Sequence, residues 1–462
     1  MKMSLPAYKH FEILYQTENL KNLYEKTIHH NTASGIDRMV KRVFDKKVDL
    51  HLSIINRKVF NGSYKYTAYR EKLFIKSKNN FPRVISIPTI RDKIVLKGLH
   101  KIIQESFSIE QPLVQTVVGD MKNELENFDS FIKIDIKNFY DNINHSILDK
   151  KLSKKIRTPL VKDLILNAIR TPTVSKNHSK DDSLYSNCVG VPQGLSISNV
   201  LAEVYFQDMD KKYKSKKRFR YYRYVDDILI LCKEKDILKI KNDIFKNIEE
   251  EHRLKLNKGK CSQGRIDRVG YDFLGYRIEK LESIGDVGLT IKNSTKLKFE
   301  KSIVDMFSRY SHSNTISPKE FIFYLNNKIT GSISNKLNGI SDKEKKYGWV
   351  FFYSQIGDKK VFHHFDWFVK KLIDDFKLKE NFKGLEIKSF VKTYYEIIYN
   401  RSKTKYIHRP DTLTTEEKKF LLIDIFKVKD RFLKTDDQIE RFYYAKVYKP
   451  IKLLEQDVQD IS

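Results

Sequence analysis

Apolar and polar residues alternate along two short segments of the chain, and this alternation predicts strands. In FIKIDIKNF (131–139), three isoleucines alternate with Lys133 and Asp135, which is the period of a half-buried strand. YRYVDDILILC (222–232) carries aromatic or β-branched residues on both sides of two acids. This second segment reads as a strand, a tight turn and another strand.

Further patterns predict a hairpin and many helices. The stretch 69–87 has two β-rich runs on either side of a polar turn, which is typical of a hairpin. Apolar residues recur at helical spacing in four other segments. These segments are 1–60, 91–107, 199–213 and the part from about residue 295 to the end.

The composition predicts a folded protein with a large core in a reducing cytosol. The chain has 462 residues, of which 40% are hydrophobic, enough for about three domains of ordinary size. It contains no apolar run near the roughly 18 residues that span a bilayer, and its start lacks the apolar core of a signal peptide. We therefore expect no membrane association. The three cysteines lie far apart, which argues against a disulfide framework and a Cys-based zinc module.

The net charge favours a polyanionic partner. Lys and Arg number 88 and Asp and Glu 59, so the formal net charge is +29. A folded protein this basic repels itself unless it binds a polyanion such as nucleic acid. A lysine-rich proteome would produce the same excess, so the distribution of the charges has to decide.

Three acids on two predicted strands suggest a metal site. Asp226 and Asp227 should lie at the tip of the second predicted hairpin, where two adjacent carboxylates repel each other unless cations neutralise them. Asp135 ends the other strand, on the side opposite the isoleucines. If the strands are neighbours, the acids form a set of hard oxygen ligands suited to Mg²⁺. Two such ions can activate a 3′-hydroxyl and stabilise a leaving pyrophosphate.

An isolated aromatic-x-Asp-Asp string is common, but its context here is specific. Between the two acidic sites lies GVPQGLSISN (190–199). Its Gly and Pro residues allow the backbone to approach a ligand closely, and a helix follows directly. An acid-bearing strand, a Pro-Gln-Gly turn that opens a helix, and an aromatic-x-Asp-Asp hairpin, in that order, favour nucleotidyl transfer.

In these motifs the sequence resembles the reverse transcriptases, especially those of bacteria. The similarity runs from about residue 30 to about residue 375. Palm-like motifs are DIKNFYDNI (135–143), GVPQGLSISNVLAEVYF (190–206), YRYVDD (222–227) and RLKLNKGKC (253–261); finger-like elements are TASGID (32–37) and FPRVISIPTIRDKIV (81–95). The resemblance implies an α+β right-hand polymerase, with fingers, a palm containing an antiparallel sheet, a thumb and an α-helical C-terminal extension.

The same resemblance implies a division into four parts. Residues 1–130 would form the N-terminal segment and fingers, and residues 131–280 the palm with finger elements between its motifs. Residues 281–372 would form a thumb-like helical region. Residues 373–462 would form a C-terminal helical extension, which leaves open a homo-oligomer formed through that region.

The family's catalytic roles fall on residues of this chain. Asp135 and Asp226 would bind two Mg²⁺ ions directly, with the backbone carbonyl of Ile136, and Asp227 would be a supporting carboxylate; Mn²⁺ is an alternative metal. Gln193 would contact the incoming nucleotide. Tyr140 would pack beneath the sugar and exclude a 2′-hydroxyl, so that deoxynucleotides are the substrates. The alternative for Tyr140 is a core tyrosine beside Phe139.

Basic residues match positions that hold the triphosphate. Arg83, Lys78 and Arg91 correspond to finger residues that pair with phosphate oxygens. Arg91 has an alternative, a pair on the helix surface with Asp92 or another neighbouring acid. Lys260 matches a lysine credited with protonating pyrophosphate, and its alternative is an ordinary surface lysine.

One tract is the densest positive stretch of the chain. KKYKSKKRFRYYR (211–223) has eight basic residues, four aromatic residues and no acid, and it leads directly into the Asp-Asp turn. Charge interleaved with aromatic faces suits a nucleic-acid backbone and its bases, although a lysine run is also typical of a solvated face. The predicted nucleic-acid contacts are Lys211, Lys212, Lys214, Lys216, Lys217, Arg218, Arg220 and Arg223.

The region after the palm indicates the type of enzyme. No zinc-binding or HNH-like endonuclease pattern follows the polymerase motifs, and residues 321–373 resemble the thumb of bacterial defence-associated and abortive-infection reverse transcriptases. This implies a cytoplasmic bacterial enzyme of antiphage defence with an RNA template, dNTPs and a DNA product. Alternatives are template-independent or protein-primed synthesis, with Tyr443, Tyr444 and Tyr448 as conceivable primers. Others are a retron or intron type enzyme with its own noncoding RNA, and an RNA-binding scaffold without activity.

Overall fold

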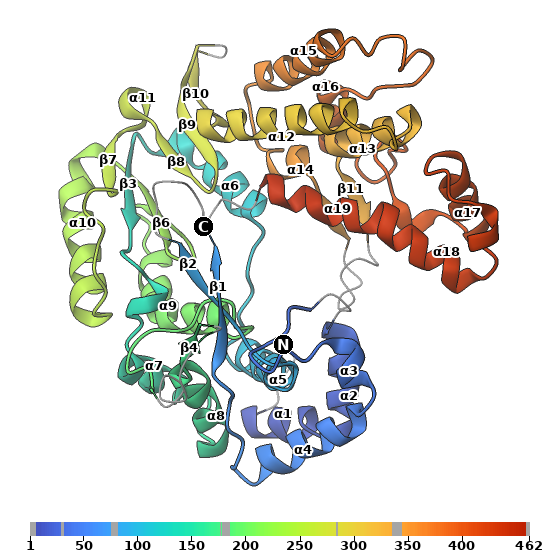
Figure 1. Ribbon diagram of the computed structural model, residues 1–462. Coiled ribbons are helices and arrows are strands. Elements are labelled where there is room, and N and C mark those ends of the chain that lie inside the picture. Colours follow the sequence, from blue (N-terminus) through green and yellow to red (C-terminus); the bar gives the residue numbers. More distant parts are fainter. Residues whose placement is uncertain are drawn as a thin grey trace. The chain divides into compact units, whose positions relative to one another are not determined.

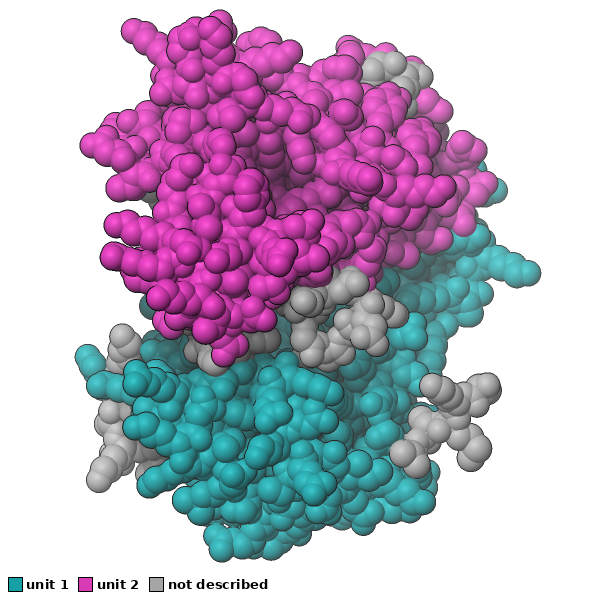
Figure 2. All heavy atoms as spheres, turned by 90° about the vertical axis from the view of Figure 1, so that its right-hand side faces the viewer, with its two compact units in different colours: residues 1–112, 131–263 teal, residues 113–130, 264–462 magenta. Residues whose placement is uncertain are grey.

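The structure, a computed structural model, divides the chain into two compact units. The first unit comprises Met1–Pro112 and Phe131–Gln263, and the second comprises Leu113–Ser130 and Gly264–Ser462; Figure 2 shows them in teal and magenta. The structure describes residues 6–28, 32–74, 82–175, 177, 185–282, 285–334 and 344–458. Lys78 lies outside these residues. The predicted division into four parts stays a prediction.

The N-terminal helices of the first unit pack around one long helix, α5 (Ile90–Ser106), as Figure 1 shows. The helix begins after Pro88, and the Thr89 side chain caps it by accepting a hydrogen bond from the Asp92 backbone N–H. Its apolar face is fully buried. The surrounding helices are α1 (Ala7–Leu14), α2 (Thr17–Thr27), α3 (Lys41–Asp45) and α4 (Val48–Phe60). The helical interpretation of the N-terminal region is thus confirmed for the described residues, 6–28 and 32–60, with a non-helical segment before α3.

The predicted hairpin at 69–87 is also confirmed. Strands β1 (Tyr69–Phe74) and β2 (Arg83–Ile87) pair antiparallel, with Arg70 opposite Ile87 and Phe74 opposite Arg83. A short third strand, β4 (Thr173–Val174), runs parallel to β1.

A four-stranded sheet carries the predicted acids. Its order is β5-β6-β3-β7, and β5 and β6 pair antiparallel as the sequence predicts. The strands are β3 (Ser130–Asp135), β5 (Arg220–Tyr224), β6 (Asp227–Cys232) and β7 (Ser262–Arg265). Residues 228–232 of β6 are completely buried, because β6 is an inner strand and an apolar core packs against it.

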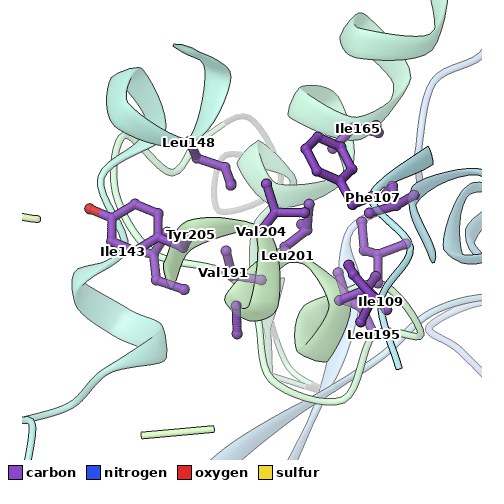
Figure 3. Close-up of a cluster of buried hydrophobic side chains, with 14 of the residues drawn as sticks. Phe107, Ile109, Ile143, Leu148, Ile165, Val191, Leu195, Leu201, Val204 and Tyr205 are labelled. Atoms are coloured by element: carbon purple, nitrogen blue, oxygen red, sulfur yellow. The ribbon is translucent and has the colours of Figure 1, made fainter. Parts of the chain in front are cut away.

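That core is built largely by helix α9 (Ser198–Lys214). Figure 3 shows Leu201, Val204 and Tyr205 of this helix among Leu148 and Ile165. Burying each such side chain contributes roughly 1.5–3 kcal/mol, so α9 is fixed firmly. The other helices of this unit are α7 (His145–Leu152), α8 (Pro159–Arg170) and α10 (Ile237–Lys246).

The second unit combines a small sheet with helices. Strands β8 (Tyr271–Phe273), β9 (Tyr276–Leu281) and β10 (Asp286–Ile291) form an antiparallel meander. Trp349 is fully buried and stacks on Phe299 with ring centroids 4.8 Å apart. The helices are α6 (Val114–Asn123), α11 (Ile266–Val269), α12 (Asn293–Ser311), α13 (Pro318–Thr330), α14 (Trp349–Phe352), α15 (Lys360–Asp375), α16 (Phe390–Tyr399), α17 (Thr415–Asp424), α18 (Asp436–Tyr443) and α19 (Lys449–Leu453).

The expected α+β class, with antiparallel sheets and a helical C-terminal part, is confirmed. The helical pattern missed one feature, the pair β11 (Ser332–Ser334) and β12 (Lys345–Tyr347). Strands this short have too few residues to show a period. In the part of the chain that the structure describes, no helix has the length and apolarity needed to cross a bilayer.

A prediction tests the close packing of Gly331, just before β11, against Tyr347 at the end of β12. Gly331 has φ 67°, and a Cβ there would lie 2.1 Å from the Tyr347 carbonyl oxygen. Gly285 has a similar φ, 70°, but nothing within 4 Å. We expect Gly285→Ala to cost about 1–2 kcal/mol for its left-handed backbone alone, and Gly331→Ala to cost about 1–3 kcal/mol more. Urea unfolding followed by tryptophan fluorescence measures this, since both tryptophans, Trp349 and Trp367, lie in the second unit. Equal costs for the two variants would contradict the packing described here.

Candidate active site

The turn between β5 and β6 presents two acids at its tip. Tyr224 pairs with Asp227, so the loop consists of Val225 and Asp226 alone. Val225 has φ 57°, a left-handed conformation that is strained for a β-branched residue. Strain of this kind costs about 1–3 kcal/mol and persists only where surrounding contacts impose it.

Arg223 lies in β5, just before this turn, and is buried rather than exposed on the surface. Its side chain is 2% exposed and binds Glu203 at 2.5 Å and Asp210 at 2.6 Å, both on α9. The guanidinium also donates to the Val225 carbonyl at 2.8 Å. The prediction that Arg223 contacts nucleic acid is therefore wrong, because all its donors face protein.

Asp135 ends the strand next to β6. Its backbone carbonyl accepts from the Asn257 N–H at 2.9 Å, and the Lys137 N–H donates to the Lys255 carbonyl at 2.8 Å. Ile136 and Leu256 form the antiparallel bridge between these two bonds. In such a pair the N–H and C=O of Ile136 point away from Leu256, so this contact leaves the Ile136 carbonyl available as the predicted ligand.

Tyr140 connects the end of β3 to the acidic turn. It begins a short 3₁₀ turn (Tyr140–Asn142), and its hydroxyl donates to the Asn199 Oδ1 at 2.7 Å. Burial, together with the negative charges of Asp226 and Glu203, raises the pKa of Tyr140. The strand that precedes Tyr140, β3, ends at Asp135 and is the sheet neighbour of β6, which begins at Asp227.

The Pro-Gln-Gly turn is fixed between the Tyr140 segment and the hairpin β1–β2. The Val191 N–H donates to the Tyr140 carbonyl at 2.8 Å, and the Ser86 N–H to the Gln193 carbonyl at 2.7 Å. Gly194 has φ 101°, and a Cβ there would lie 2.8 Å from the Ile85 side chain. Gln193 is half-buried and lies against the strand that begins with Arg83.

A cavity opens on the other side of this turn. Its volume is about 360 Å³, and Gly194, Asn199 and Glu203 contribute to its wall together with His100 and Gln104 of α5. Asn199 ends the motif 190–199, but the sequence pattern alone assigns it no role. The feature that could have indicated one is its position one residue after the start of α9. The wall of the cavity thus contains both Gly194 of the Pro-Gln-Gly turn and Glu203, the residue that binds Arg223.

The remaining predicted basic residues are distributed around the site. Arg83 is exposed at the start of β2, and Arg91 is half-buried in the first turn of α5. The alternative pair of Arg91 with Asp92 is not formed, since the Asp92 carboxylate faces inward and accepts from Tyr64 and Thr89 at 2.8 and 2.7 Å. Lys260 is exposed in the turn after Asn257, and both interpretations of it remain.

The basic tract leads into the acidic turn, but most of its residues lie away from that turn. Lys211, Lys212 and Lys214 end α9, which has 17 residues and is therefore about 25 Å long. The tract then leads into β5 at the end opposite the acidic turn. Lys212 lies 3.7 Å from Asp243, and Arg218 binds Asp236. Lys216 and Lys217 are exposed and Arg220 is half-buried, so contact with nucleic acid away from the turn stays a prediction.

The donor set fits a hard divalent cation, although the side chains do not enclose one. The candidate ligands are carboxylate and carbonyl oxygens on two neighbouring strands, which is the chemistry Mg²⁺ prefers. Within the described ranges, no three or more His, Cys, Asp or Glu residues are gathered closely enough to hold a metal ion. The convergence of Asp135, Asp226 and Asp227 on a shared ion thus stays a prediction.

A prediction tests how the Pro-Gln-Gly turn is held. Gly194→Ala should push the turn off β2, because the added methyl group meets Ile85 and the Ser86 carbonyl and the backbone is left-handed. An overpacking cost of about 1–3 kcal/mol corresponds to roughly tenfold to hundredfold faster amide exchange if opening is local. Hydrogen exchange of residues 83–87 and 190–197 measures this. Gly62→Ala is the control, since its φ is 73° but its Cβ would meet only the end of the Leu160 side chain; unchanged exchange in Gly194→Ala would contradict the docking.

Comparisons with known proteins agree with these motifs. Residues 75–278 match the family model "Reverse transcriptase (RNA-dependent DNA polymerase)". The chain is 23% identical to the group II intron-encoded protein LtrA of Lactococcus lactis subsp. cremoris over 44% of this chain and 33% of that protein. It is 25% identical to the retron Ec83 reverse transcriptase of Escherichia coli over 34% and 50% of the two chains.

A solved structure and the extent of the relatives complete the comparison. Telomerase from Candida albicans, solved with a fragment of telomeric RNA, is similar with a TM-score of 0.43 and 14% identity, over 92% of this chain and 69% of that chain. The alignments span half or less of the two curated relatives. Residues 75–278 of the chain are thus similar to a reverse transcriptase domain.

Proposed function

We propose that the chain is an RNA-directed DNA polymerase that adds deoxynucleotides to a 3′-hydroxyl on an RNA template. The observation that carries this proposal is that β3, which ends at Asp135, lies beside β6, which begins at Asp227 directly after Asp226. The Pro-Gln-Gly turn is bonded to the Tyr140 segment. The reverse transcriptase match over residues 75–278 includes all of these elements.

In this proposal Asp135, Asp226 and Asp227, with the Ile136 carbonyl, hold two divalent cations, with Mg²⁺ as the metal. Bound ions of this kind would supply activation of the 3′-hydroxyl and neutralise the charge of the leaving pyrophosphate. The chain's own residues mainly position the groups that react and supply positive charge. Lys260, which is exposed in a turn bonded to the Asp135 segment, would give a proton to pyrophosphate.

The nucleotide would lie between the turn and the hairpin. Gln193 would contact it from the Pro-Gln-Gly turn, and Arg83, Arg91 and Lys78 would hold its triphosphate through charge-assisted hydrogen bonds. The Tyr140 ring would lie beneath the sugar, where a 2′-hydroxyl has no room. Its hydroxyl is bonded to Asn199, which keeps the ring in one orientation.

We also propose a role in antiphage defence. This rests on the resemblance of residues 321–373 to defence-associated enzymes, and the helices of the second unit would then hold RNA or product. A second candidate is an enzyme that works with its own noncoding RNA, which the similarity to an intron-encoded protein and a retron enzyme favours. Sequencing the RNA that copurifies with the protein separates the two, since a single structured RNA encoded beside the gene supports the second.

The burial of the three candidate tyrosines limits which of them could prime DNA synthesis. Tyr443 and Tyr448 are buried, and their hydroxyls donate to the Pro410 carbonyl and to Asp411. These two tyrosines therefore belong to a buried hydrophobic cluster of the second unit. Tyr444 is 43% exposed, so among these three tyrosines only its hydroxyl is open to nucleotide transfer.

The first functional prediction concerns the acids. Asp226→Asn and Asp135→Asn should each lower DNA synthesis by at least about 10³-fold, because each loses a charge that holds metal and several kcal/mol of transition-state stabilisation. Asp227→Asn should cost less, since it is a supporting carboxylate. Primer extension on an RNA template with Mg²⁺ measures this, and an unchanged melting temperature shows that the variants fold.

A matched control separates catalysis from surface charge. Asp49→Asn removes a carboxylate that pairs with Lys21 at 3.2 Å on the surface of the same unit, and DNA synthesis should be unaffected. If Asp226→Asn kept full synthesis, the proposed role of Asp226 would fail. If it lost synthesis but kept full biological activity, the RNA-binding scaffold would replace the enzyme proposal.

The second functional prediction concerns the choice of sugar. Tyr140→Ala removes the ring proposed to lie beneath the sugar, so the preference for dNTPs over rNTPs should fall by roughly 10²-fold. Tyr140→Phe keeps the ring and loses only the bond to Asn199, and it should keep most of the preference. The ratio of kcat/KM for dNTP and rNTP measures both variants, and an unchanged ratio in Tyr140→Ala would make Tyr140 a core tyrosine.

A further inference from the structure

Arg223 uses every donor of its guanidinium within the protein. Its Nε and Nη2 donate to the Asp210 carboxylate at 2.8 and 2.6 Å. Its Nη1 and Nη2 donate to the Glu203 carboxylate at 3.1 and 2.5 Å. The fifth bond, from Nη1, reaches the Val225 carbonyl at 2.8 Å. An arginine has five N–H donors, so the side chain is saturated and its geometry is fixed.

The bond from Arg223 Nη1 to the Val225 carbonyl restrains the backbone of the acidic turn. Val225 precedes Asp226 directly, is 8% exposed and has the left-handed φ of 57°. A carbonyl fixed by a buried arginine prevents this peptide from rotating to a relaxed conformation. The directions of the Asp226 and Asp227 side chains depend on that peptide, since both residues follow it immediately.

The two carboxylates connect the turn to a rigid helix. Glu203 and Asp210 are seven residues apart on α9, which puts them on one face of the helix. Asn199, near the start of the same helix, accepts from the Tyr140 hydroxyl. The Phe206 ring lies 5.1 Å from the guanidinium carbon and covers it. The same helix thus contacts Tyr140 at its first turn and the acidic turn through Arg223.

We propose that Arg223, with Glu203 and Asp210, is a positioning unit that sets the divalent-cation affinity of the Asp226–Asp227 turn. This inference rests on the proposed function, in which that turn binds metal. The three side chains touch neither metal nor substrate; they act through the Val225 carbonyl. Partners that orient metal ligands in this way typically change metal affinity by about 10–100-fold when they are altered.

The test is Arg223→Lys, with Mn²⁺ as the probe. Lysine keeps the buried positive charge but has three donors on one nitrogen, so it cannot bind both carboxylates in bidentate fashion and the Val225 carbonyl together. Free Mn²⁺ measured by electron paramagnetic resonance gives the affinity without any need for activity. We expect Arg223→Lys to bind Mn²⁺ about 10–100-fold more weakly. The Mg²⁺ concentration that gives half-maximal DNA synthesis should rise by a similar factor, with synthesis largely recovered at high Mg²⁺.

The chain offers a closely matched control in Arg277. It too binds two carboxylates, Asp272 at 3.3 Å and Glu279 at 3.0 Å, and a backbone carbonyl, that of Val269 at 3.1 Å. Arg277→Lys should leave Mn²⁺ affinity unchanged. If Arg277→Lys weakened Mn²⁺ binding equally, or if Arg223→Lys bound Mn²⁺ like the wild type, the proposal would be overturned.

A second variant covers the case in which Arg223→Lys does not fold. The triple change Arg223→Met, Glu203→Gln and Asp210→Asn removes the arginine and its partners together, so no buried charge is left unpaired. It should also lose Mn²⁺ affinity, and wild-type affinity in it would overturn the proposal. A wild-type protein that binds no Mn²⁺ would do the same. A wild-type protein that binds Mn²⁺ but makes no DNA would defeat the proposed function, while the comparison of affinities would still decide this inference.

Discussion

The candidate site depends on backbone hydrogen bonds that join segments far apart in sequence at one edge of a sheet. The Val191 N–H reaches the Tyr140 carbonyl, the Ser86 N–H reaches the Gln193 carbonyl, and the Asn257 N–H reaches the Asp135 carbonyl. Bonds of this kind have strict geometry, so the three contacts place the hairpin, the Pro-Gln-Gly turn and the Asp135 segment within narrow limits. The side chains that would do chemistry inherit their positions from these bonds.

Much of this edge could be predicted because it depends on local patterns. The isoleucine alternation identified β3, and the apolar runs around Asp226 and Asp227 identified β5 and β6. Gly194, which allows a close approach to β2, lies where the motif places it. These features need only a few neighbouring residues to show a period or a turn. The strand pair β11–β12 was missed because its strands are too short to show one.

Other features could not be predicted because they depend on which face of an element is buried. Arg223 stands in a run of lysines and arginines, and nothing in that run separates it from its exposed neighbours. The signal lay elsewhere, in Glu203 and Asp210, whose spacing of seven residues puts two acids on one face of helix α9. The position of the basic tract could not be predicted either. The 17 residues of α9 lead the chain away from the site, and β5 then leads it back.

The charges around Arg223 support the proposal that the acidic turn binds a cation. Arg223 carries one positive charge and its partners Glu203 and Asp210 two negative ones, so the buried unit has a net charge of about −1. Asp226 and Asp227 follow the Val225 carbonyl that Arg223 binds, and they add further negative charge. Like charges in a partly buried place repel strongly, since screening by water is weak there. Hydrogen bonds from Arg223 satisfy Glu203 and Asp210, and the half-buried Asp226 and Asp227 would attract a cation. In the proposed site, the strained Val225, the saturated arginine and the two half-buried acids would then act together in binding that cation.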